Sequence, residues 1–491
     1  MSSKLNFLAF DLGASSGRAL VGTLDNGKIS LSEVHRFENG PVAVGDSLYW
    51  DVLRLFDAMK YGLRQAVQSV GPNLAGAGID TWGVDFALLG KNDVLLETPH
   101  HYRDSRTEGM IEEVEKIVPH AEIYENTGIQ FMDLNTLFHM YAIQKNNPWL
   151  FECTERLLMF PSLLNFWFTG AKADESSHVS TSQMYNPQTG DWARPMIEKL
   201  GIPTRILGDI VPPGTVIGKL RQSIMEETGA SAIPFVAPAT HDTGSAVAAV
   251  PTLERDYAYI SCGTWSLVGI ESDSPIINDA ALNFNFTNEG GIGNTRFLRN
   301  VSGLWLIQEC RRVWATKGKE FSFAELVELA LKATPFSAVI DPDDAIFSKP
   351  GDMPQRIKDY CAKTGQPVPE SEGQIIRVAL ESLALKYRWV IERLDSFVGH
   401  RIPVIHMVGG GIQNRLLCQL TADVTGRQVI AGPVEATALG NILLQAIGLG
   451  HIGSLREGRE IIRRSFEMVE YTPKPDSKIE EAYAKLESLL P

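Results

Sequence analysis

Two turns rich in glycine and in serine or threonine, together with a triple glycine far from both, have the composition of loops that a phosphate or a flat ligand can approach. They are residues 11–18 (DLGASSGR), residues 262–266 (CGTWS) and the triple glycine at 409–411. Backbone N–H groups in such turns form anion-binding concavities, and glycine lets the backbone approach a phosphate closely. Asp11, at the tip of the first turn, can face a hydrated Mg²⁺. Because the strand–turn–strand pattern occurs twice, we interpret the first two turns as phosphate loops. The triple glycine follows a predicted strand and precedes a helix, which suits close approach to a flat ligand or a phosphate; a tight loop is the alternative.

Asp242 is the candidate acid–base residue. Residues 233–237 predict a buried strand, and residues 240–243 (THDT) follow it at the start of an alanine-rich helix. α/β folds place their chemistry at the carboxyl ends of strands, which favours a catalytic carboxylate at this position. Helix starts also use Asp and Thr as N-caps, so position alone leaves Asp242 and Thr243 open to either interpretation.

A third segment, residues 76–89 (GAGIDTWGVDFALL), predicts two strands that meet at Trp82 and Gly83. Asp80 and Asp85 flank this break. Two aspartates beside a glycine in an apolar strand pair indicate a cleft rather than a core, and an ordinary turn is the alternative.

The elements that would carry these residues are strands and helices. Residues 7–12 and 19–22 predict two strands around the first turn, and Asn26-Gly27 returns the chain into a third strand. Helical spacing of apolar residues predicts a helix from residue 50 to about 70 and another over 372–397. Residues 335–370, rich in Pro, Asp and Gly, are expected to form an irregular surface excursion.

Residues 256–270 repeat the strand–turn–strand pattern of the N-terminus and open a second half about as long as the first. A chain of this length is too long for one core, so we predict an α/β protein with two domains, 1–250 and 251–491. Asn300 is predicted in a loop that enters a helix, as a cap or a ligand. Residues 109–201 are expected to be mostly helical.

Composition and charge exclude several classes of protein. The 491 residues are 44% hydrophobic and 21% charged, as in soluble globular proteins. A net charge of −14 without a basic run argues against a nucleic-acid partner, and no apolar run has the length of a membrane span. The five cysteines are scattered, so we expect neither a disulfide framework nor a zinc site. We therefore expect a cytoplasmic protein.

Three other known motifs match the sequence only in part. Residues 13–17 fit the G-x-S-x-G pattern of serine hydrolases, and their glycines are similar to a dinucleotide-binding fingerprint. Both motifs require a helix after the turn, where a strand is predicted. Residues 212–219 are one residue short of a P-loop and lack the Ser or Thr after the lysine. If the protein binds ATP, it does so with a fold other than the P-loop fold.

The order D-x-G-x-x-S-G-R, G-T-W-S and G-G-G before a helix resembles the two phosphate segments and the adenosine segment of the actin/hexokinase/Hsp70 ATPase fold. Within that superfamily, the strand ending in THDT is similar to the FGGY carbohydrate kinases. Residues 11–18, 78–86 (GIDTWGVDF), 102–107 (YRDSRT) and 431–436 (AGPVEA) resemble the branch of this family that phosphorylates L-rhamnulose. The likeness extends from Phe7 to about Pro475.

The resemblance implies an α/β fold of two ribonuclease-H-like (actin-like ATPase) domains with a cleft between them. It also implies an ATP- and Mg²⁺-dependent transfer to the 1-hydroxyl of L-rhamnulose in rhamnose catabolism. Asp242 would be the catalytic base, and Asp11 would orient Mg²⁺ through water. The implied sugar contacts are Gly83, His241, Thr243 and Asn300, and the implied ATP contacts are Ala14, Ser15, Ser16, Gly17, Arg18, Thr264, Gln308 and Gly410.

The implied partners are ATP and a small-molecule ketose, with the chain acting as a monomer or a small homo-oligomer. One alternative is an FGGY kinase for another ketose, such as L-fuculose or L-xylulose. Another is a non-kinase actin-fold ATPase, such as a chaperone or a reductase activator; the scattered cysteines count against an activator. Residues 161–170 lack the Lys-Asp pair common in other FGGY kinases, so a role of that pair does not transfer.

Overall fold

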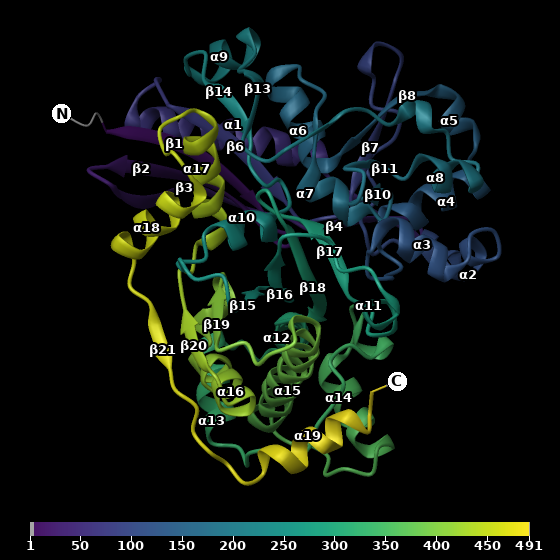
Figure 1. Ribbon diagram of the computed structural model, residues 1–491, viewed down its shortest axis with the longest axis vertical. Helices are drawn as coiled ribbons and strands as arrows, with labels where there is room; N and C mark the ends of the chain where they lie inside the picture. The colour runs from purple at the N-terminus through teal and green to yellow at the C-terminus, as the bar shows by residue number, and fades with distance from the viewer. Residues whose placement is uncertain (1–3, 491) are drawn as a thin grey trace. The chain divides into compact units, whose positions relative to one another are not determined.

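The computed structural model describes residues 4–490, which form two compact units (Figure 1). Unit 1 comprises the described parts of Met1–Leu253, Glu271–Phe297 and Ala436–Ser465. Unit 2 comprises those of Glu254–Ile270, Leu298–Glu435 and Phe466–Pro491. The first change of unit falls close to the boundary expected near residue 250. The chain then returns to unit 1 twice, so each unit contains stretches from both halves of the sequence.

Unit 1 is built on a six-stranded sheet in the order β13-β14-β6-β1-β2-β3. Its strands are β1 (Leu5–Leu12), β2 (Ser16–Asp25), β3 (Lys28–Glu38), β6 (Gly76–Thr81), β13 (Thr215–Lys219) and β14 (Pro234–Ala237). β1, β6 and β14 run parallel, whereas β2, β3 and β13 pair antiparallel to their neighbours. The carboxyl ends of β1, β6 and β14, where the candidate residues were predicted, therefore meet at one edge of the sheet.

Two long helices cover the opposite faces of this sheet (Figure 1). α1 (Val52–Val70) packs so closely that a Cβ on its Gly62 would lie 2.7 Å from Cβ of Ala19. On the other face, a Cβ on Gly22 would lie 2.3 Å from Ile442 of α17 (Ala436–Gly448). Because odd and even positions of a strand point to opposite faces, Ala19 and Gly22 show that the two helices lie on either side of β2.

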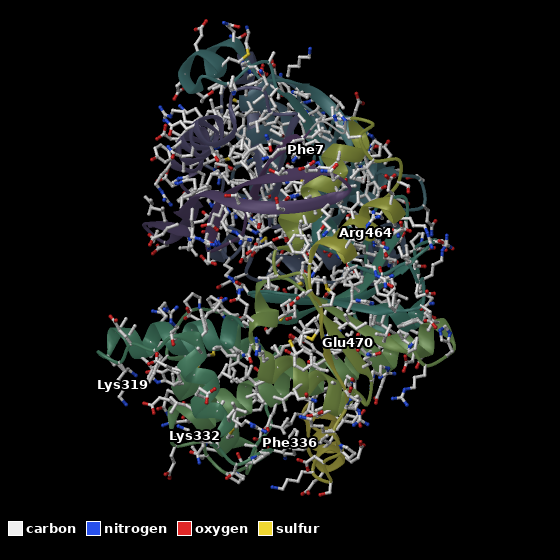
Figure 2. The ribbon with its side chains drawn as sticks, turned by 90° about the vertical axis from the view of Figure 1, so that its left-hand side faces the viewer. Phe7, Lys319, Lys332, Phe336, Arg464 and Glu470 are labelled. Carbon is white, nitrogen blue, oxygen red and sulfur yellow. The ribbon has the colours of Figure 1, made fainter. Side chains whose placement is uncertain are left out.

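The core of unit 1 follows from the apolar runs of its strands. Phe7 of β1, labelled in Figure 2, is fully buried and meets the His451 ring edge-on. Beside the sheet, the antiparallel pair β7 (Phe86–Gly90) and β8 (Thr154–Met159) carries a second apolar cluster. That cluster is covered mainly by the helices α2 (Met110–Glu115), α3 (His120–Thr127), α4 (Thr136–Asn146), α5 (Trp149–Cys153) and α8 (Arg194–Lys199). The region 109–201 thus contains strands as well as the predicted helices.

Unit 2 repeats the topology at the heart of unit 1. Its hairpin β15 (Ala258–Cys262) and β16 (Trp265–Ser272) corresponds to β1 and β2. β15 then pairs parallel with β19 (Val404–Val408), and β19 pairs parallel with β20 (Gln428–Ala431). The sheet continues to β21 (Val469–Tyr471) on one side and from β16 to β18 (Thr295–Ser302) on the other. The predicted recurrence of the strand–turn–strand pattern is confirmed.

Unit 2 also contains helices. They are α12 (Trp305–Thr316), α13 (Phe323–Leu331), α14 (Met353–Lys363), α15 (Glu372–Val398), α16 (Arg415–Thr425) and α19 (Ile479–Glu487). Of these, α16 packs on β20 and β21 of this sheet. α15 begins where predicted because the Ser371 hydroxyl and the Gln374 side chain cap it reciprocally. Gly399, in a left-handed conformation (φ 78°), ends it.

The prediction of an irregular surface excursion over 335–370 is wrong. Phe336, labelled in Figure 2, donates its backbone N–H to Glu381 of α15 at 2.7 Å. Asp341 is buried and accepts from the Lys386 ammonium at 2.8 Å, and α14 follows. Buried ionic contacts to α15 therefore hold a segment whose Pro, Asp and Gly content suggested an exposed loop.

Candidate active site

Two carboxylates lie side by side at the edge of the unit 1 sheet. Asp11 of β1 is the register partner of Asp80 of β6, so both side chains project from the same face. Arg18 lies 2.5 Å from Asp11, and the Asn441 amide of α17 donates to Asp80 at 2.5 Å. Burial, followed by the charge of Asp11, raises the pKa of Asp80 well above its usual range. One oxygen of Asp80, Oδ1, is buried without a hydrogen-bond partner.

Asp242 stands next to this pair, as the first residue of α10 (Asp242–Ala248). β14 and residues 238–241 lead to Asp242. The Thr81 N–H, at the end of β6, donates a hydrogen bond of 2.9 Å to the Thr240 carbonyl and so joins this segment to β6. Oδ1 of Asp242 accepts from the Thr243 backbone N–H at 2.6 Å and from the Thr243 hydroxyl at 3.2 Å. Burial, opposed by His241 and reinforced by Asp11, raises the pKa of Asp242. The structure thus brings Asp11, Asp80, Asp242 and Thr243 to one place.

Gly83 lies in a strained turn between β6 and β7. Val84 adopts φ 69°, a conformation that costs a β-branched residue energy. The Val84 N–H donates to the Thr181 hydroxyl at 2.9 Å, and its carbonyl accepts from the Thr136 hydroxyl at 2.5 Å. A Cβ on Gly83 would lie 3.2 Å from the Thr181 side chain, so glycine lets the turn pack closely against Thr181.

Asp85, after this turn, is a core residue, and the prediction that Asp80 and Asp85 line a cleft is wrong for it. Its Oδ2 accepts from the indole N–H groups of Trp50 and Trp82, each at 2.6 Å. Burial outweighs these bonds and raises the pKa of Asp85 to about 7. β6 and β7 also do not pair with each other, because β7 pairs with β8 and β6 pairs with β1 and β14.

His241, just before Asp242, is held by two residues that sequence reasoning missed. Oε2 of Glu289, in β17 (Thr287–Gly290), lies 3.1 Å from the His241 Nδ1. Nη2 of the fully buried Arg296, in β18, lies 3.0 Å from that carboxylate oxygen and 3.3 Å from Nδ1. Nε2 of His241 lies 3.5 Å from Oδ1 of Asp242. Glu289 and Arg296 carry no motif, so only the fold identifies them.

The first predicted phosphate loop closes tightly between β1 and β2. The Gly13 N–H donates to the Ser16 carbonyl at 2.9 Å, and the Asn39 amide donates to the Gly13 carbonyl at 2.8 Å. A Cβ on Gly17 would lie 2.2 Å from the Phe37 ring, which explains glycine at that position. Ala14, Ser15 and Ser16 form the loop between these contacts, beside Asp11 and Arg18.

Unit 2 holds the second loop and the triple glycine. The Thr264 carbonyl accepts from the N–H groups of Gly303 and Trp305, each at 3.1 Å, which ties the loop to the start of α12. Gln308 lies one turn further along this helix. Gly409 and Gly411 pack on the end of β15, where a Cβ on Gly411 would lie 2.3 Å from the Cys262 sulfur, whereas a Cβ on Gly410 would meet no atom within 4 Å.

Asn300 differs from its prediction. It lies within β18 and not in a loop that enters a helix, because α12 starts only at Trp305. It belongs to unit 2 together with Thr264, Gln308 and Gly410, whereas Gly83, His241, Asp242 and Thr243 belong to unit 1.

The carboxylate pair fits a magnesium ion better than a metal held entirely by protein. Among residues 4–490, no group of three or more His, Cys, Asp or Glu side chains is arranged to hold a metal ion. Mg²⁺ commonly uses one or two carboxylates and takes its other ligands from phosphate and water. Asp11, with Asp80 beside it, supplies such a set.

Comparisons with known proteins agree over almost the whole chain. Residues 6–249 match the N-terminal domain, and residues 258–449 the C-terminal domain, of the FGGY family of carbohydrate kinases. A rhamnulokinase from Bacteroides thetaiotaomicron is 42% identical over 481 residues, which cover 98% of each chain. A rhamnulokinase from Bacillus subtilis is 38% identical over 469 residues, 95% of each chain.

Solved structures with little sequence likeness have the same fold. Gluconate kinase from Lactobacillus acidophilus superposes with a TM-score of 0.78 at 15% identity, covering 99% of this chain and 96% of that one. Plasmodium falciparum glycerol kinase with ADP gives 0.78 at 15% identity, covering 99% and 97%. The predicted α/β fold of the actin-like ATPase type is confirmed. No helix formed by residues 4–490 has both the length and the apolar character needed to cross a membrane.

Proposed function

Because the chain belongs to the FGGY family of carbohydrate kinases, which use ATP as phosphate donor, we propose that it phosphorylates the 1-hydroxyl of L-rhamnulose. One observation carries the choice of sugar. Seven curated relatives, each 38–43% identical over at least 94% of this chain, are called rhamnulokinase.

Asp242 acts in this proposal as the general base. Its Oδ1 is occupied by Thr243, which leaves the second carboxylate oxygen to accept the proton of the sugar hydroxyl. A raised pKa makes the carboxylate a stronger base. General-base catalysis of this kind contributes about 10²–10⁴-fold.

The remaining groups bind and position the two substrates. Gly83, His241 and Thr243, with Asn300, would contact the sugar. Support comes from the short distance, 3.5 Å, between Nε2 of His241 and Oδ1 of Asp242. Thr243 orients Asp242 through two hydrogen bonds and would lie beside the sugar with it.

ATP would contact the two loops and the triple glycine. The residues assigned to it are Ala14, Ser15, Ser16, Gly17, Arg18, Thr264, Gln308 and Gly410. Arg18 would offset charge on the phosphoryl oxygens, and the open space at Gly410 suits close approach of a flat ring. Asp11, with Asp80 behind it, would hold Mg²⁺ through water; the ion, when bound, neutralises phosphate charge.

A coupled ADP-release assay tests the proposal with L-rhamnulose, L-fuculose, L-xylulose, D-xylulose and glycerol as acceptors. We expect the highest kcat/KM for L-rhamnulose. A higher value for another ketose would overturn the choice of sugar and keep the kinase, whereas ADP release that no acceptor stimulates would overturn the kinase itself. Size-exclusion chromatography of the same preparation tests whether the enzyme is a monomer or a small homo-oligomer, and cell fractionation tests a cytoplasmic location.

A further inference from the structure

His241 lies in a buried group of charges that fixes where its proton sits. Arg296 is fully buried and Glu289 is 4% exposed, so both charges are shielded from water. The Arg296 Nε donates to the Gly290 carbonyl at 2.9 Å, which aims the guanidinium at the histidine. Its Nη2–H then points at the His241 Nδ1 with hydrogen-bond geometry at 3.3 Å.

Two groups face Nδ1 of His241: Nη2 of Arg296, which can only donate a hydrogen bond, and Oε2 of Glu289 at 3.1 Å, which can only accept one. Oε2 is paired with Nη2 at 3.0 Å, so we assign the ring from its contact with Arg296. A guanidinium has five N–H donors and no acceptor, and it keeps its proton in proteins. An Nδ1 that accepts from Arg296 therefore carries a lone pair, and the proton of the neutral ring is on Nε2. The Glu289 carboxylate, 3.0 Å from Nη2, balances the guanidinium charge and so favours its placement beside the ring.

The other ionisable neighbours of His241 do not reverse this assignment. The ring of His178, in α7 (Ser176–Val179), lies 6.3 Å away, centroid to centroid. Burial lowers the pKa of His178 to about 3, so it is neutral at pH 7. Asp242 faces the opposite ring nitrogen, Nε2, at 3.5 Å. A protonated Nε2 beside this carboxylate is favourable.

We propose that Arg296, with Glu289 as its counter-charge, is a positioning residue that holds His241 as the neutral Nε2–H tautomer. The inference rests on the proposed function for its substrate consequence. His241 then donates a hydrogen bond next to the place where Asp242 accepts one. Such a donor–acceptor pair recognises two neighbouring oxygens of the sugar. The 1-hydroxyl gives its proton to Asp242, and the oxygen on carbon 2 accepts from Nε2.

The tautomer can be read directly in the protein without substrate. In long-range ¹H–¹⁵N correlation spectra of protein labelled with ¹⁵N-histidine, neutral histidines show one protonated and one unprotonated nitrogen. His241→Asn identifies the signals of His241 by their loss. We expect the protonated type at Nε2 and the unprotonated type at Nδ1. The reverse pattern, or two protonated nitrogens at pH 7, would overturn the proposal, and this result needs no active enzyme.

Kinetics of variants test the positioning role. Arg296→Met leaves Glu289 beside Nδ1, which then takes a proton, so the Nε2–H tautomer is lost. We expect the KM for the sugar to rise about twofold to tenfold, the size of a lost hydrogen bond between neutral groups, while the KM for ATP is unchanged. Arg296→Lys, which keeps the charge without the fork of donors, should give a smaller rise. Arg36→Met, which removes an arginine from an exposed pair with Glu33, is the matched control and should change neither KM.

Three kinetic results would overturn the positioning role: an unchanged sugar KM in a folded Arg296→Met enzyme, an equal rise in both KM values, or an equal rise in the Arg36→Met control. If Arg296→Met fails to fold, Arg296→Lys and the spectrum of the unaltered protein still decide. If the enzyme prefers another sugar or phosphorylates none, the proposed function is wrong. The NMR spectrum still tests the tautomer of His241, because it is recorded without substrate.

Discussion

The buried carboxyl of Asp85 should make the stability of unit 1 fall as the pH rises from acid to neutral. Its pKa is about 7 in the folded protein, against 3.8 for the unperturbed group. Between these values the unfolded chain loses the proton while the folded chain keeps it, so the unfolded state binds fewer protons and the free energy of unfolding decreases with pH. The stabilising contribution is complete below the unfolded pKa and is lost once the pH passes the folded pKa.

The size of the effect follows from the difference in pKa. At about 1.4 kcal/mol for each pKa unit, the shift from 3.8 to about 7 amounts to about 4 kcal/mol, of which about 3 kcal/mol falls between about pH 4.5 and pH 8. Asp85→Asn removes the titration and keeps an oxygen that can accept from Trp50 or Trp82.

Urea unfolding followed by tryptophan fluorescence measures this contribution across that pH range. We expect the unfolding free energy of Asp85→Asn to rise relative to the unaltered protein by about 3 kcal/mol between the two ends of the range. The buried histidines titrate in both proteins and cancel in the difference. Asp46→Asn, at an exposed turn, is the control and should follow the unaltered protein. Parallel pH profiles for Asp85→Asn and the unaltered protein would refute the reasoning.

Three further predictions concern packing, ATP and the thiols. Gly440→Ala places a Cβ 1.7 Å from the Ser245 carbonyl oxygen and should lower the unfolding free energy by about 3 kcal/mol. Gly40→Ala, whose Cβ would meet no atom within 4 Å, should leave it unchanged. Equal urea midpoints for the two variants would contradict this prediction. Gly410→Leu should fold normally, by circular dichroism, and raise the KM for ATP more than that for the sugar; unchanged ATP kinetics would remove Gly410 from the nucleotide site. Cys153 is the exposed cysteine among the five, so a thiol reagent should titrate one thiol rapidly in the native protein and five in denaturant; rapid native reaction of several thiols would contradict the described burial.

Features set by short stretches of chain could be predicted from the sequence. The strand–turn–strand at Asp11 and its repeat at Thr264 depend on glycines and small residues next to apolar runs, and both form as predicted. The strand that leads to Asp242 and the helix that starts there are likewise local. These patterns were enough for the fold and for placing several candidate residues at the ends of strands.

Contacts between distant segments could not be predicted in this way. Asn441 and Asp80 are 361 residues apart in sequence, and no spacing rule connects them. Arg296 reads as an ordinary charged residue of a strand until the fold places it beside His241. Such residues are recognised only when the partner that neutralises or orients them is known.

Two predictions were wrong because composition was taken as a sign of exposure. Asp85 next to a glycine indicated a cleft, yet two indole N–H groups satisfy its carboxylate inside the core. The segment 335–370 looked like a surface loop, yet Lys386 neutralises its buried Asp341. In both cases buried polar partners contact the carboxylate; for Asp85 they offset only part of the cost of burial, and its pKa stays raised.

The most direct test of the account is transfer of phosphate from ATP to L-rhamnulose by Asp242→Asn, measured in a single turnover beside ATP binding by calorimetry. The account predicts that transfer slows by at least about 10²-fold while the affinity for ATP stays within a factor of about two. Transfer at the rate of the unaltered enzyme would show that Asp242 is not the base. The proposed arrangement of Asp242, His241 and the sugar would then be contradicted.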